Sequence, residues 1–377
     1  MKALILGCLL VVSAIAEWKV SGEVELTGVT TLDAPTKASI HVTESPITTT
    51  GGVKACYTTN STSTKIILSN RLDDTYIEHL SFTYKGRMGK HMYSTQVGTI
   101  DTFKGVFTSS EGATKQNPFI FKNHGIYNNE YLAGYLDTTV GFQQTYSYMA
   151  PYATLLTAKY SITQARELGE ARAEGSIYGY NSKYVDLDYS TPIHSVDLQL
   201  EYRDNFKLFF NKAKIIIKFD ATDNVPDDLM TTYLAERDPS IFVPKTPLDI
   251  DITRGGFMYR NTYAVYGYEA YKMYYENKDL NTEYSAVGQL HYLAAYPTDD
   301  FTPYISYGES TNSKAGSRKY TEKIAGFRYT YNDNVTLLCE WKKSSWIQHR
   351  SFAEHVAYLS TDKRHIEILS TRLILSF

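Results

Sequence analysis

From Trp18 onward, apolar and polar residues alternate with a period of two in one segment after another. In the first segment, Trp18, Val20, Val24 and Leu26 alternate with Lys19, Ser21, Glu23 and Glu25. Side chains of a β-strand point alternately to opposite faces, so such a segment has one apolar face and one water-facing face. The pattern predicts a two-faced β-strand.

The same alternation recurs along the chain, which predicts one continuous all-β architecture. Three further segments have an apolar set, which we expect to face lipid, and a polar set, which we expect to face water. These are Val140, Phe142, Tyr146 and Tyr148 against Thr139, Gln143, Thr145 and Ser147; Val196, Leu198, Leu200 and Tyr202 against Ser195, Asp197, Gln199 and Glu201; and Leu290, Tyr292, Ala294 and Tyr296 against Gln289 and His291.

Short turns separate some of the segments, and long polar connections separate others. The turns at 203–205, 260–262, 297–300 and 332–334 are tight, whereas 221–248 and 344–364 are long. Short turns at one end and long loops at the other are typical of a transmembrane antiparallel β-barrel. Segment counting predicts about 16 strands, with 18 as the alternative because 31–64 and 161–190 are ambiguous.

The first sixteen residues have the features of a secretory signal. Met1 and Lys2 precede an apolar run, and small residues end it at Ala16, as at a signal-peptidase site. We therefore expect residues 1–16 to be a signal peptide and 17–377 to be the exported barrel. A lipoprotein signal at Cys8 is the weaker interpretation, because Cys8 lies inside the apolar run.

Composition supports a membrane barrel and disfavours several other classes. After Ala16 no apolar run approaches the about 18 residues of a spanning helix, while the chain has 33 Tyr and 16 Phe, which suit aromatic belts at membrane interfaces. The net charge of -3 gives no reason to expect nucleic acid as a partner. A tyrosine-rich secreted β-protein remains an alternative, and pairing of Cys56 with Cys339 stays open.

The C-terminal segment carries the most specific motif. Phe377 is the last residue, and Leu375, Leu373 and Leu369 share its face. This segment resembles the closing strand of bacterial outer-membrane proteins, and 326–337 resembles the last periplasmic hairpin of Gram-negative porins. The resemblance implies an outer-membrane location among lipid and lipopolysaccharide, recognition of Phe377 by the barrel-assembly machinery, and a homotrimer.

In porins a long loop folds into the barrel and narrows it, and 99–129 resembles that loop. On this interpretation the charged loop residues in the lumen are Asp101, Lys104, Glu111 and Lys115. We expect the opposite wall to be basic, because strand phase turns Lys212, Lys214 and Lys218 inward if Phe209, Ala213 and Ile215 face lipid. The full set of expected wall cations is Arg87, Lys90, Lys212, Lys214, Lys218, Arg254, Arg260, Arg328 and Arg372.

Catalytic interpretations are weaker. His79 and Ser81 have the His-x-Ser spacing of outer-membrane phospholipases, but Leu80 and Phe82 occupy the expected lipid face, so we place the pair in the lumen. Asp227 with Asp228, or Asp249 with Asp251, could bind Ca²⁺, although solvated loops have the same composition. We expect no enzyme, no cofactor and no metal site.

Together these patterns predict a porin that passes small hydrophilic solutes and ions, with a weak preference for anions. Two alternatives remain: a channel specific for one solute, and a barrel used for adhesion or surface recognition through its loops.

Overall fold

The computed structural model describes residues 18–33, 47–71, 74–100, 139–165, 176–177, 180–181, 185–188, 192–221, 248–277, 282–313, 319–347 and 364–377. The predicted signal peptide, 1–16, and most of the predicted inward loop lie outside these residues. The strands are β1 (Trp18–Asp33), β2 (Ile47–Thr58), β3 (Thr62–Arg71), β4 (Asp74–Met88), β5 (His91–Ile100), β6 (Thr139–Ala150), β7 (Thr154–Ala165), β8 (Ser176–Ile177), β9 (Tyr180–Asn181), β10 (Val185–Asp188), β11 (Pro192–Tyr202), β12 (Phe206–Ala221), β13 (Leu248–Arg260), β14 (Ala264–Asn277), β15 (Thr282–Ala295), β16 (Phe301–Ser313), β17 (Lys319–Asn332), β18 (Val335–Ile347) and β19 (Arg364–Ser376).

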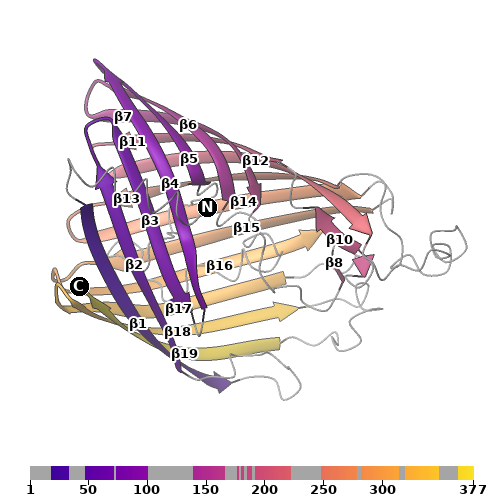
Figure 1. Cartoon of the computed structure of the whole chain (residues 1–377). Coiled ribbons are helices and arrows are strands. Elements are labelled where there is room, and N and C mark those ends of the chain that lie inside the picture. The colour runs from indigo at the N-terminus through magenta and orange to yellow at the C-terminus, as the bar shows by residue number, and fades with distance from the viewer. Residues whose placement is uncertain are drawn as a thin grey trace, which may run out of the picture.

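The strands form a closed antiparallel barrel of 16 strands (Figure 1). Each strand from β1 to β6 pairs with the next, β7 pairs with β11, and from β11 to β19 each strand again pairs with the next. Strand β19 pairs with β1 and closes the barrel. The predicted all-β barrel of about 16 strands is confirmed.

Three short strands lie in a stretch that the sequence left ambiguous. Strands β8 and β9 pair only with each other, as a separate two-stranded sheet. Strand β10 pairs with the last residues of β12, from Val185 opposite Ala221 to Asp188 opposite Lys218. This stretch therefore extends the wall beside β12 and does not add two further spanning strands.

The described turns all lie at one end of the barrel. They join β2 to β3, β4 to β5, β6 to β7, β11 to β12, β13 to β14, β15 to β16, and β17 to β18. In the turn between β11 and β12, Arg203 and Asp204 have positive φ angles of 49° and 55°, which let two residues reverse the chain. Phe377 lies at this same turn end, because its amide bonds to the carbonyl of Gly22.

Large apolar side chains cover much of the outer surface of the barrel. Phe142 on β6, Leu198 on β11 and Leu337 on β18 are among many large apolar side chains that are exposed on the isolated chain. Their strand neighbours in register share the outer face, as Leu198 does with Ala158 and Phe210. The phase predicted for β1, β6 and β11 is correct. A closed barrel with such a surface suits a hydrocarbon environment.

The predicted phase of β15 is wrong. Leu290, Tyr292 and Ala294 are almost completely buried on the inner face, where they pack with Val265, Tyr304 and Ile324. Gln289 and His291 lie on the outer face instead. There Gln289 donates to Glu309 Oε1 at 2.6 Å, and the His291 ring lies 3.0 Å from the Tyr266 hydroxyl. The alternation was recognised correctly, but the apolar set packs inside the barrel.

Cys56 and Cys339 cannot form the bridge that the sequence left open. Cys56 pairs in register with Lys19 on the inner face, whereas Cys339 pairs with Phe327 and Thr371 on the outer face. Both are free thiols. Within the described ranges, no helix is long and apolar enough to cross a membrane.

Candidate functional site: the barrel lumen

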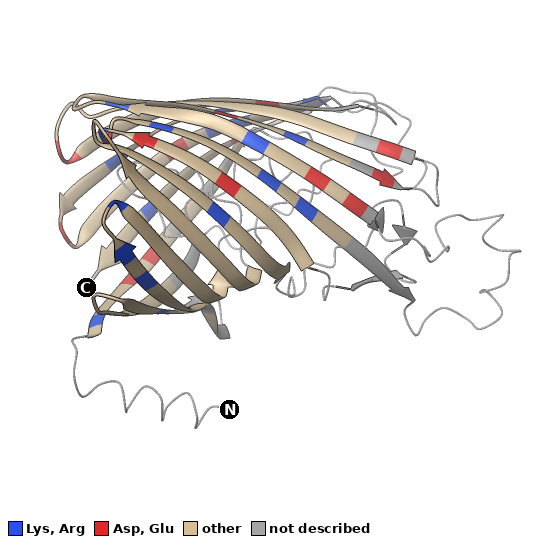
Figure 2. Cartoon of the chain, turned by 90° about the horizontal axis from the view of Figure 1, so that it is seen from above, with Lys and Arg blue, Asp and Glu red and all other residues tan. Residues whose placement is uncertain are grey.

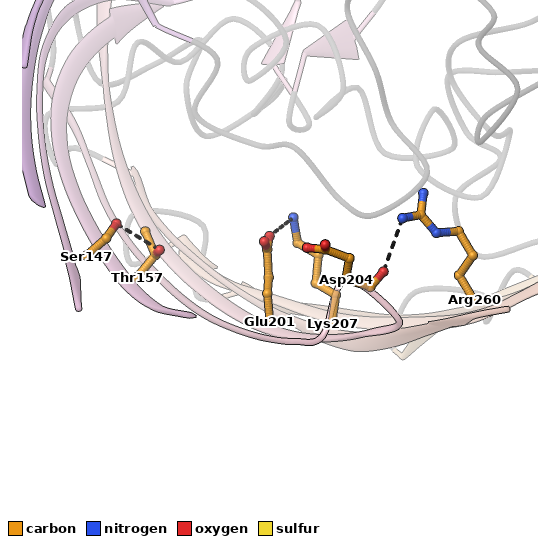
Figure 3. Close-up of polar contacts among 6 residues, drawn as sticks. All are labelled: Ser147, Thr157, Glu201, Asp204, Lys207 and Arg260. Atoms are coloured by element: carbon orange, nitrogen blue, oxygen red, sulfur yellow. Dashed lines mark hydrogen bonds and ion pairs between the residues drawn. The ribbon is translucent and has the colours of Figure 1, made fainter. Parts of the chain in front are cut away.

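The inner face at the turn end of the barrel is polar and charged. Figure 3 shows Ser147, Thr157, Glu201, Lys207 and Arg260 pointing from the five neighbouring strands β6, β7, β11, β12 and β13 toward the barrel interior. Ser147 and Thr157 are hydrogen-bonded through their hydroxyls at 2.9 Å, and Lys207 Nζ lies 3.0 Å from Glu201 Oε1. This end of the lumen is therefore lined by water-compatible groups.

Arg260 extends furthest from the wall in this group. Its Nη2 donates to the backbone carbonyl of Asp204 at 3.2 Å, across the gap between two turns. Nearby, burial raises the pKa of the Tyr296 phenol, while the positive charge of Arg260 acts in the opposite direction. Arg260 thus places a permanent positive charge at the turn-end mouth.

Strand register extends this inner face around the whole barrel, because residues opposite each other in neighbouring strands share a face. Among the described side chains of this face, cations outnumber carboxylates. The inner cations are Lys19, Lys54, Lys65, Lys85, Arg87, Lys159, Lys207, Arg254, Arg260, Arg328, Lys342 and Arg372. The inner carboxylates are Glu23, Glu25, Asp197, Glu201, Glu269, Glu322 and Glu340.

The ion pairs farther from the turns are the most deeply buried. Arg254 Nε lies 3.2 Å from Glu269 Oε1, and the two side chains are 3% and 0% exposed. Lys342 Nζ lies 2.7 Å from Glu322 Oε2. Buried charges require such partners, because unpaired ionised groups are strongly disfavoured away from water. These pairs stiffen the wall and add little net charge.

Carboxylates also neutralise part of the inner wall near the barrel seam. Arg372 Nη1 on β19 lies 3.2 Å from Glu25 Oε2 on β1, and both side chains are mostly buried. Arg328 instead donates to the Thr330 hydroxyl at 2.6 Å. Both arginines face inward, in the orientation that the sequence predicted.

The inner cations that lie close to the turns are more accessible. Lys85 and Arg87 are exposed on the inner face of β4, just before its turn, and Lys207 and Arg260 flank the turns of β12 and β13. The excess of positive charge is therefore presented to water mainly at the turn-end mouth. Figure 2 shows the Lys and Arg positions in blue and the Asp and Glu positions in red along the strands.

The inward orientation predicted for Lys212 and Lys214 is wrong. Lys212 lies opposite Val196 and Lys214 lies opposite His194, both on the outer face of β11. Phe209, Ala213 and Ile215 are the buried inner residues. Strand β12 is apolar on both faces, so its pattern did not determine its phase. Lys218 is in β12, but its side chain is not among those described.

Two of the predicted wall cations, Arg87 and Lys90, do not lie near the entry of the predicted inward loop. Arg87 and Lys90 were expected near the entry of the inward loop, but they lie at the turn between β4 and β5. All of β5 separates them from Ile100, where that strand ends. The loop residues Asp101, Lys104, Glu111 and Lys115 lie outside the described residues.

Several lumen residues were not predicted from the sequence. Lys207 and Lys159 face inward, and so does Lys342 with its partner Glu322. Alternation with Leu208 would have identified Lys207, and alternation with Ala158 and Tyr160 would have identified Lys159. Lys342 is flanked by a tryptophan and a second lysine, so its own pattern is ambiguous.

His79 and Ser81 form a hydrogen-bonded pair on the inner wall. His79 Nε2 lies 2.8 Å from Ser81 Oγ, and both residues are buried. The lumen-side placement predicted from Leu80 and Phe82 is correct. A membrane lipid at the outer face therefore lies on the other side of the wall from this pair.

Acidic residues are not grouped as metal ligands in the part of the chain that the structure describes. Asp249 and Asp251 lie on the outer face of β13, and Asp249 Oδ2 is 2.9 Å from Lys214 Nζ. Asp227 and Asp228 lie outside the described residues.

The fold matches solved outer-membrane proteins over nearly their whole length. The outer-membrane channel DcaP of Acinetobacter baumannii superposes with a TM-score of 0.61 at 12% identity, covering 96% of this chain and 97% of that chain. An anion-selective porin from Comamonas acidovorans gives 0.59 at 8% identity, with 96% and 100% covered. OmpT, an outer membrane protein of Vibrio cholerae in a trimer form, gives 0.57 at 10% identity, with 96% and 99% covered. No protein-family model matches the sequence, and no curated protein is significantly similar to it.

Proposed function

We propose that this protein is a porin that lets small hydrophilic solutes and ions diffuse passively through its lumen, with a weak preference for anions. The observation that carries the proposal is the excess of inner-face cations over carboxylates, most accessible at the turn-end mouth. A barrel of 16 strands is too wide for its wall side chains to fill. Water and solutes then occupy the remaining space.

Selectivity in this proposal is electrostatic. Lys85, Arg87, Lys207 and Arg260 raise the local concentration of anions at the turn-end mouth. Glu201 and the buried carboxylates offset part of that field, so the preference is weak. The predicted inward loop, 99–129, with Asp101, Lys104, Glu111 and Lys115, stays a prediction from the sequence and would narrow the path further.

The proposal also includes where the protein is located in the cell and how it assembles. We propose a signal peptide at 1–16 and an outer-membrane barrel over 17–377, surrounded by lipid and lipopolysaccharide. The apolar outer face supports the membrane location, and β19 together with Phe377, which follows it, supports recognition by the barrel-assembly machinery. A homotrimer is consistent with the trimer form of the Vibrio cholerae protein, whose fold is similar. The anion-selective porin of similar fold is consistent with the proposed selectivity.

Catalysis is not part of the proposed function. His79 and Ser81 are hydrogen-bonded to each other, and both are buried on the lumen side. The proposal assigns this pair a structural role in the wall.

Liposome swelling tests the proposal directly. The refolded full chain is placed in liposomes loaded with a polymer too large to escape, and the vesicles are then diluted into isotonic sugars of increasing size. The proposal expects swelling rates that fall with sugar size and exceed those of protein-free liposomes. Swelling with one sugar alone would support a solute-specific channel. No swelling from inserted, folded protein would overturn the porin assignment.

A further inference from the structure

The outer face carries an apolar groove at its turn half. The groove has a volume of about 710 Å³ and extends from His91 on β5 across β6, β7 and β11 to β12. Tyr146, Ala158, Leu198 and Phe210 form one lateral row through it, since each lies opposite the next in register. Ala158 is the smallest of the four, so the surface is hollowed between two aromatic rings.

The next row of outward residues, farther from the turns, is apolar on β7 and β11 and becomes polar and basic from β12 onward. It begins with Tyr160 and Val196 and continues with Lys212, Thr253 and Lys272 on β12, β13 and β14. Lys212 is the first outward residue after Phe210, which lines the groove, so Lys212 borders the groove on the side away from the turns. The groove thus has an apolar floor and a basic rim along one side.

Lys212 and Lys272 differ from the neighbouring outer-face lysines in their surroundings. Lys214 pairs with Asp249 at 2.9 Å, and Lys343 pairs with Glu367. Lys212 and Lys272 are exposed and have no hydrogen bond or ion pair within the described part of the chain. A lysine on the lipid-facing surface is disfavoured unless its charge reaches an interface or an anion.

The spacing of these two lysines suits a phosphate group. Adjacent strands are about 4.8 Å apart, so Lys212 and Lys272 are separated at their backbones by about 10 Å, with Thr253 between them. Both long side chains can converge over the Thr253 hydroxyl, which supplies a further donor. Asp251, the next outward residue of β13, is an acidic neighbour that weakens the positive potential of this row.

We propose that this groove and its rim bind one anionic phospholipid-type molecule, with the phosphate at Lys212, Thr253 and Lys272 and an acyl chain along Leu198 and Phe210. The apolar floor matches the chain and the unneutralised lysines match the headgroup. The rim lies on the loop side of the groove, so the headgroup points away from the turn end. The inference rests on the proposed membrane location and does not depend on conductance.

Native mass spectrometry of the detergent-solubilised full chain tests the site. Phosphatidylglycerol and phosphatidylcholine with the same acyl chains are the two lipid probes, and inorganic phosphate is the third. We expect a saturable adduct with phosphatidylglycerol that phosphatidylcholine does not form. The double variant Lys212→Gln/Lys272→Gln weakens it on the order of tenfold, and Asp251→Asn strengthens it.

Two further variants separate the alternatives. Ala158→Phe fills the groove and is expected to weaken the phosphatidylglycerol adduct, whereas Lys323→Gln, an exposed outer-face lysine on β17, leaves it unchanged. Heat-modifiable migration on a gel confirms that each variant is folded.

Three results would overturn the proposal. Equal adducts with both lipids would remove the headgroup site. If inorganic phosphate displaces the phosphatidylglycerol adduct, and does so equally in the Ala158→Phe variant, the two lysines would be assigned to free phosphate. Loss of oligomers in Ala158→Phe with unchanged lipid adducts would assign the groove to contact with a second copy of the chain. Single-channel current is measured on the same variants. If the current is unchanged while the lipid adduct is absent, the lipid site fails and the porin proposal stands.

Discussion

The ring of Phe377 lies directly over Gly22, and a Cβ added at Gly22 would come within 2.2 Å of the Phe377 ring. The two residues also exchange backbone hydrogen bonds, each at 2.9 Å. Phe377 is the C-terminal residue and Gly22 belongs to the first strand, so this contact fastens the seam between β19 and β1 at the turn end. Only a residue without a side chain leaves room for the ring.

Gly22→Ala is therefore expected to destabilise the closed barrel, because the aromatic ring has to leave the seam. Gly51→Ala is the matched control on β2, where an added Cβ would have its nearest contact at 3.7 Å. The measurement is the fraction of heat-modifiable, folded protein after refolding into detergent. Equal folded fractions for the two variants would contradict the packing argument.

The buried pair of Arg254 and Glu269 is expected to matter far more to stability than the exposed pair of Lys207 and Glu201. Glu269→Ala removes the carboxylate that lies 3.2 Å from Arg254 Nε inside the wall, and breaking a buried ion pair in this way costs about 3–5 kcal/mol. Glu201→Ala removes a partly exposed pair, worth about 0–1 kcal/mol. Urea unfolding of both variants in lipid vesicles measures the difference, and similar losses would show that the Arg254 site is solvated.

Charge at the inner wall is expected to set ion selectivity, and charge at the outer face is not. Arg260→Gln removes an accessible lumen cation, so the reversal potential in a KCl gradient shifts toward cation preference. Lys214→Gln also removes one positive charge, but from the outer face, and leaves the reversal potential unchanged. A shift in Lys214→Gln as large as that in Arg260→Gln would contradict the assigned phase of β12.

The His79 and Ser81 pair is expected to have no hydrolytic role. The refolded protein should release no more fatty acid from phospholipid vesicles than a protein-free blank, and Ser81→Ala should retain the single-channel conductance. Hydrolysis that disappears in Ser81→Ala would show that the pair is a catalytic site open to lipid.

The barrel itself could be predicted from the sequence because its evidence is repeated in many strands. Alternation in β1, β6 and β11 identified both the strands and their faces, and tight turns such as 203–205 marked one end. Strand phase failed where the inner wall is apolar. Leu290 and Tyr292 pack against inner residues of neighbouring strands, and no pattern within β15 distinguishes such a face from a lipid-facing one.

The inward or outward orientation of a lumen residue was predictable only where its flanking residues clearly belonged to one face of the strand. Arg328 lies between Phe327 and Tyr329, which face outward, so its inward orientation followed from its neighbours. Lys212 follows Phe209 and Phe210, which point to opposite faces, so either phase was equally consistent with the sequence. Ion pairs between strands, such as Arg254 with Glu269, depend on register, which single-strand patterns do not specify.

Single-channel recording tests the central claim most directly. The mature chain, refolded and inserted in a planar lipid bilayer, is predicted to give stepwise current increases, with a reversal potential in a KCl gradient that indicates weak anion preference. Inserted, heat-modifiable protein that carries no current would contradict the diffusion-pore account, and would favour a role in adhesion or surface recognition.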